Sequence, residues 1–130
     1  MDKKETITPE VEKTFGESAS ERITSTAAEE MRKSIVRTGG REVFFAGTLN
    51  SDGKISSVRV VARGNEGAVP ALFEGLKSRE VVIHNHPSSN VAPSEADLQL
   101  ASIFSFQGHG VFIVDNEISR VYVVVEPQRE

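Results

Sequence analysis

The apolar residues of this chain fall into short segments that alternate between the spacing of a helix and the spacing of a strand, which limits the folds open to it. The first segment is apolar at every fourth position, as one face of a helix would be, at Ile23, Ala27, Met31 and Ile35. Gly39-Gly40 follows and can end a helix in the left-handed conformation. We therefore expect a helix over about 20–38, where Ser18-Ala-Ser-Glu21 and Thr26-Ala-Ala-Glu29 both have the pattern of a capping box.

The rest of the chain has mainly strand patterns. Two segments rich in Val, Ile and Phe flank Asn50-Ser-Asp-Gly53, which is typical of a hairpin turn. The expected elements are strands over 42–49 and 54–63, a helix over 69–77, a strand over 79–84, a helix over 94–107, and strands over 111–115 and 120–126. Their order predicts an α/β fold in which helices sandwich a mixed β-sheet.

Length and charge restrict the class of protein further. A chain of 130 residues fits one domain, which we place at 18–127 after a flexible N-terminal segment over 1–17. No apolar run is long enough to span a membrane, and the charged start at Met1 does not resemble a secretory signal, so we expect a cytoplasmic protein. The net charge of -4 and the scattered Lys and Arg argue against direct nucleic-acid binding.

The candidate site lies at the end of the strand expected over 79–84. His84 and His86 are two apart, so their side chains point to one face of a strand. Ser94 and Asp97 open the helix that follows, and a turn can bring Asp97 back to both histidines. Two imidazoles and one carboxylate with a fourth position open make a catalytic zinc site, and a chain without cysteine has no thiolate ligands for a structural one.

Each part of this pattern also has a simpler interpretation. A His-x-His pair is common by chance, Ser94 three residues before Asp97 is typical of a helix cap, and a proline after a strand simply ends it. The combination His84-x-His86-Pro87, six residues, then Ser94-x-x-Asp97 is far more specific than its parts. We expect the third histidine, His109, to serve packing or the surface.

The combined pattern resembles the JAMM motif of JAB/MPN-domain metallopeptidases, and it matches the motif without a gap. The similarity extends over about 31–127, and Arg41-Glu42-Val43-Phe44 resembles the start of the RadC-like bacterial branch. The resemblance implies a JAB/MPN fold of cytidine-deaminase-like architecture and a Zn²⁺ ion held by His84, His86 and Asp97. It also implies that Glu42 is the general base and that Ser94 donates a hydrogen bond to the oxyanion, a role compatible with a cap.

Three functions remain open at this stage. The first is a zinc-dependent peptidase or isopeptidase. Its substrate would be a protein or peptide, for example one with a ubiquitin-like tail. The second is a RadC-like accessory domain in DNA repair or helicase function, with a binding role. For this one, Gly40 to Phe45, Val82 to Pro87 and Val121 to Pro127 resemble a module found ahead of DinG-type helicases. The third is a scaffold without catalysis, which the complete motif disfavours.

Overall fold

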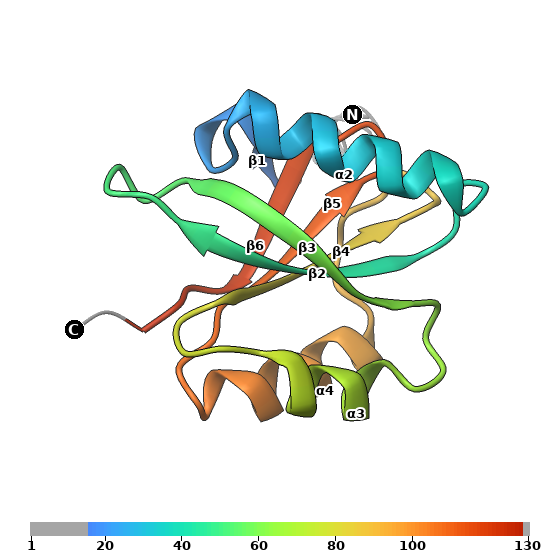
Figure 1. Cartoon of the computed structure of the whole chain (residues 1–130). Helices are drawn as coiled ribbons and strands as arrows, with labels where there is room; N and C mark the ends of the chain where they lie inside the picture. The colour runs from blue at the N-terminus through green and yellow to red at the C-terminus, as the bar shows by residue number, and fades with distance from the viewer. Residues whose placement is uncertain (1–15, 129–130) are drawn as a thin grey trace, which may run out of the picture.

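A six-stranded mixed sheet forms the centre of the molecule (Figure 1). The computed structural model describes residues 16–128. The strands are β1 (Glu17–Ser18), β2 (Val43–Leu49), β3 (Ile55–Arg63), β4 (Val81–His86), β5 (Val111–Asp115) and β6 (Arg120–Val125). They lie in the order β1-β6-β5-β4-β2-β3. Only the β4–β5 pair is parallel among these described strands, and every other pair is antiparallel.

Helices cover both faces of this sheet. Helix α2 (Ser25–Arg37) lies on one face, and α3 (Ala68–Gly75) and α4 (Glu95–Ser105) lie on the other (Figure 1). A single turn of 3₁₀ helix, η1 (Ala19–Glu21), precedes α2. The predicted α/β fold with a mixed sheet between helices is therefore confirmed, as is the predicted order of its main elements.

Each face of the sheet has its own apolar cluster. The cluster beneath α2 is the larger and includes Met31, Ile35, Phe45, Ile83 and Phe112. The cluster beneath α3 and α4 includes Phe44, Leu72, Val82, Phe104 and Val111. Neighbouring residues of one strand appear in opposite clusters because successive side chains of a strand point to opposite faces.

Strand β4 shows how this alternation prepares a site. Val82 packs into the cluster beneath α3 and α4, and Ile83 packs into the cluster beneath α2. By the same alternation His84 and His86 face α4, whereas Asn85 faces the α2 side. Because α4 begins soon after β4 ends, its first turn lies beside the two histidines.

The first helix begins later than its apolar pattern predicts. The expected helix over 20–38 is a 3₁₀ turn followed by α2, whose N-cap is Thr24. The predictions of capping boxes at Ser18 and Thr26 are wrong, because Ser18 makes no side-chain cap bond and Thr26 lies inside α2. Tertiary pairing is the cause. Ile55 N donates to Arg22 O at 2.8 Å and Thr24 N donates to Ile55 O at 2.9 Å, so this backbone is extended where a helix was expected.

Two other boundaries also differ from the prediction. The strand expected over 79–84 is β4, which runs from Val81 through both histidines to His86, because Asn85 and His86 pair with β5. Strand β1 was not predicted, since two residues carry no periodic signal. Most of the segment 1–17, expected to be flexible, lies outside the described residues.

Among the helices over residues 16–128, none is both long enough and apolar enough to cross a bilayer.

The position of the α2 cap can be tested with two threonines. Thr24 Oγ1 accepts a hydrogen bond from Ala27 N at 3.2 Å, so Thr24→Ala should lower the free energy of unfolding by about 1 kcal/mol. Thr26 is exposed inside the helix, where Ala is the better helix former, so Thr26→Ala should leave stability equal or slightly higher. Urea denaturation measures both, and equal losses in the two variants would place the cap elsewhere.

Candidate metal centre

The ring of His84 is fully buried at the end of β4. It stacks on Phe44, with ring centroids 4.8 Å apart and an angle of 19° between the planes. Phe44 is the residue that pairs with His84 across β2 and β4, so the same ladder that aligns the strands also aligns the two rings. The stack fixes the plane of the imidazole and leaves its edge toward α4.

His86 has an oxygen atom beside each ring nitrogen. Its Nδ1 lies 2.8 Å from the backbone carbonyl of Asn90, and its Nε2 lies 2.9 Å from Asp97 Oδ2. A neutral imidazole carries one proton, so it can satisfy only one of these two acceptors. If Nδ1 donates to the carbonyl, the lone pair of Nε2 faces the carboxylate, and a metal ion could lie between them.

Asp97 is held by the start of α4 itself. Ser94 N donates to Asp97 Oδ2 at 2.8 Å, and Asp97 N donates to Ser94 Oγ at 3.1 Å, which is a reciprocal capping box. Burial acts to raise the pKa of the Asp97 carboxyl, but the contacts with His84 and with the backbone of Ser94 outweigh it and lower that pKa well below its usual range. Asp97 is therefore an ionised, fixed carboxylate.

His84 meets the other oxygen of this carboxylate. Its Nε2 lies 2.9 Å from Asp97 Oδ1, yet neither ring nitrogen of His84 makes a hydrogen bond with the described residues. The pair is close but lies off the direction of a hydrogen bond. A buried nitrogen without a hydrogen-bond partner is costly, and it is the arrangement expected where the nitrogen is a ligand.

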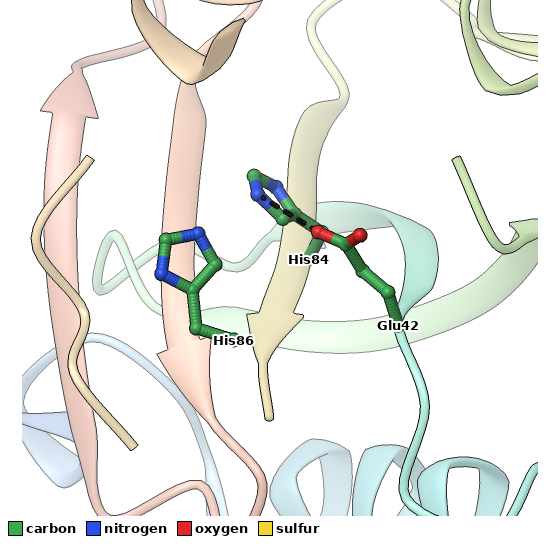
Figure 2. A group of neighbouring side chains, drawn as sticks. All are labelled: Glu42, His84 and His86. Carbon is green, nitrogen blue, oxygen red and sulfur yellow. Dashed lines mark ion pairs between the residues drawn. The ribbon is translucent and has the colours of Figure 1, made fainter. Parts of the chain in front are cut away.

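Glu42 approaches from the strand beside β4. It precedes β2, and its Oε2 lies 3.5 Å from His84 Nε2 (Figure 2). Ligand atoms of Glu42, His84 and His86 all lie within 4.8 Å of one another, so this group can hold a metal ion. The structure thus brings together the four side chains singled out in the sequence as ligands or base, which are Glu42, His84, His86 and Asp97.

The donor set fits a divalent ion such as zinc. Tetrahedral zinc takes nitrogen and oxygen ligands at about 2.0–2.2 Å, which places ligand atoms roughly 3.3 Å apart. The separations of 2.9, 2.9 and 3.5 Å between the histidine nitrogens and the carboxylate oxygens beside them bracket that spacing, and the ligand atoms of Glu42, His84 and His86 all lie within 4.8 Å of one another. Two neutral nitrogens and ionised carboxylates also supply the charge that a divalent cation requires.

Several supports of this site carried no signal in the sequence. The Asn90 carbonyl that holds His86 is a backbone atom, and the stacking of Phe44 depends on strand register.

His109 lies outside the site, buried, with its Nδ1 2.8 Å from the carbonyl of Glu80, which agrees with the packing role expected for it. Asn85 bonds the backbone at Val43 and at Arg41, both distant from it in the chain.

The chain matches the model of a known protein family. The model of the RadC-like JAB domain family matches residues 18–114, a range that includes every residue of the site. No curated protein matches the chain.

The lowered pKa of Asp97 predicts how the metal-free protein responds to acid. A carboxyl whose pKa is lower in the folded than in the unfolded state stabilises the fold above an unfolded pKa of about 4, and this contribution is lost as pH falls toward the folded value. Asp97→Asn should therefore lower the free energy of unfolding at pH 6 and flatten its decline below pH ~4. Denaturation with chelator present, over a pH series, measures this. Parallel curves for both proteins would contradict it.

Proposed function

This chain belongs to the RadC-like JAB domain family, and on that premise we propose that it is a zinc-dependent hydrolase of the JAMM type that cleaves a peptide or isopeptide bond. One observation carries the proposal. The buried Nε2 of His84 has no hydrogen bond, and it lies 2.9 Å from one carboxylate and 3.5 Å from another. A packing role would leave this nitrogen unsatisfied, whereas a ligand role gives it a partner.

His84, His86 and Asp97 would hold the ion. Each of the three is fixed by something other than the ion: His84 by stacking on Phe44, His86 by the Asn90 carbonyl, and Asp97 by the capping box. Such outer contacts orient ligands and set the histidine tautomer. The Glu42 carboxylate contacts His84 alone among these residues, and its side chain is partly exposed. We therefore assign Glu42 to proton transfer and not to the ligand set.

Zinc bound at these residues would supply a Lewis acid and would lower the pKa of a nearby water. The chain supplies the remaining chemistry. The Glu42 carboxylate lies at the rim of the site, where it can accept a proton from water at Oε2 and return it to the leaving amine. Its side chain is 19% exposed, which leaves a route for water and substrate.

Ser94 would act on the substrate oxygen. Its Oγ accepts a hydrogen bond from Asp97 N, but the hydroxyl proton is not donated to any described residue. Ser94 is exposed and adjoins the ligand Asp97 through the cap. The hydroxyl can therefore stabilise α4 as an acceptor and, at the same time, donate to a developing oxyanion.

The proposed substrate is an extended peptide or protein tail, since a scissile amide must reach residues at the end of two strands. An accessory role in DNA repair or helicase function, in which the domain binds rather than cleaves, is the alternative. Hydrolysis separates the two, because both allow a bound ion but only the first requires Glu42.

The purified protein should bind about one zinc per chain, and variants of its two carboxylates should separate metal binding from hydrolysis. Asp97→Asn should weaken zinc binding by at least about tenfold, the effect expected for a lost ligand or its support. Glu42→Gln should keep the affinity of the wild type and lose about a hundred-fold or more in hydrolysis, because it keeps the shape of the side chain but removes the base. Competition with a chelating dye measures affinity, and mass spectrometry of a mixed peptide library measures cleavage.

Each result has a clear opposite. Native protein without metal, and no rise in melting temperature on addition of zinc, would refute the metal site. Equal weakening of zinc by Glu42→Gln and Asp97→Asn would make Glu42 a fourth ligand and the site a closed, structural one. Zinc binding with no peptide cleaved would favour the accessory role.

Ser94→Ala separates the cap from the oxyanion role. Loss of the cap should lower the free energy of unfolding by about 1 kcal/mol. Loss of the oxyanion donor should lower turnover by roughly 100- to 1000-fold with zinc still bound. Thermal melts measure the first and initial rates the second. A variant that melts lower but turns over normally would leave Ser94 with the cap alone.

A further inference from the structure

The backbone pairing of β2 with β4 ends at His84 and does not reach His86. Its last pair is Phe44 with His84, although continuing the register would pair Val43 with Asn85 and Glu42 with His86. Hydrogen bonds from the Asn85 side chain take the place of the next backbone pair. Its Oδ1 accepts a hydrogen bond from Val43 N at 2.8 Å, and its Nδ2 donates to Arg41 O at 3.2 Å.

These two bonds join Asn85 to both peptide groups that flank Glu42. The Val43 N–H belongs to the peptide that follows Glu42, and the Arg41 carbonyl belongs to the peptide that precedes it. Two peptide planes held by one rigid amide define the backbone dihedrals of the residue between them. Gly64 N adds a third restraint, since it donates to Glu42 O at 2.9 Å.

A second asparagine orients the first. Asn85 Nδ2 donates to Asn116 Oδ1 at 2.6 Å, and Asn116 Nδ2 donates to Gly40 O at 3.0 Å. The amide orientations follow from the backbone partners, because an N–H requires the oxygen and a carbonyl requires the nitrogen. Asn85 is fully buried, and all these partners are met within the described residues.

We propose that Asn85 and Asn116 are positioning residues, which hold the backbone of Glu42 so that its carboxylate is directed at His84. This inference rests on the proposed function, in which Glu42 is the base. The two histidines and Asn85 share β4 but point to opposite faces, so one short segment supplies ligands on one face and the support of the base on the other. None of these hydrogen bonds involves the side chain of a proposed ligand. Their loss would therefore move Glu42 and leave His84, His86 and Asp97 in place.

Asn116→Ala tests the proposal in metal-free protein, with no substrate required. Asn116 is only half-buried, so its loss is less disruptive than loss of the fully buried Asn85. Without its acceptor, Asn85 should hold Val43 less firmly, and amide hydrogen exchange at Val43 should quicken about tenfold relative to amides within the β2–β4 ladder. The nuclear Overhauser effect between the Glu42 side chain and the His84 ring should weaken.

Two further variants act as controls. Asn116→Asp keeps the acceptor for Asn85 but loses the donor to Gly40 O, so Val43 exchange and the Glu42–His84 contact should lie between those of the wild type and of Asn116→Ala. Asn50→Ala removes an asparagine that bonds the backbone at the other end of β2, at Asp52 N and Lys54 N, so it should lower stability without selective change at Val43.

Two results would overturn the proposal: an unchanged Glu42–His84 contact in Asn116→Ala, or equal acceleration of all ladder amides. The proposed function fails separately. Absence of zinc binding or hydrolysis in the experiments above would remove the role of Glu42 as base, and it would leave the exchange and contact measurements as they are.

Discussion

Pairing of β4 on both sides is the constraint on which the rest of the site depends. The strand is held antiparallel by β2 and parallel by β5, so it can neither rotate nor slip by one residue. A slip of one residue would exchange the faces of every side chain, turning both histidines toward α2 and Asn85 toward α4. The apolar neighbours oppose this exchange, because Val82 and Ile83 each pack into the cluster of their own face.

Three polar side chains at this edge of the sheet are bonded to fixed backbone groups. Asp97 is tied to the first turn of α4, His86 to the Asn90 carbonyl, and Asn85 to the peptides around Glu42. The edge of His84, by contrast, faces two carboxylates without a hydrogen bond. Buried groups without a hydrogen bond are rare unless they have a use, and the concentration of acceptors at this one point is compatible with the binding of a cation.

The sequence predicted the strands of the hairpin and the last two strands to within a residue, because turns and β-branched segments are local signals. It also predicted that His84, His86 and Asp97 meet, since a spacing of two on a strand and of three at a helix start are local geometry as well. Glu42 was identified only from the resemblance to the JAMM motif family. It placed the start of α2 wrongly, because pairing of Arg22 and Thr24 with Ile55 overrides helix periodicity. The bonds from Asn85 to Arg41 and Asn116 could not be foreseen, because they join segments distant in the chain.

The capping box joins the stability of α4 to the geometry of the site. Ser94 and Asp97 satisfy each other's backbone N–H groups, so Asp97 is directed at the histidines by the folding of the helix alone. An ion is then not needed to organise its own ligand. Two apolar clusters, one on each face of the sheet, supply the cohesion that zinc provides in domains that are unfolded without it. The binding free energy of an ion would thus appear as affinity and would not be spent on folding the domain. Under this condition a fold can hold an ion with three ligands and leave its fourth coordination position for a substrate.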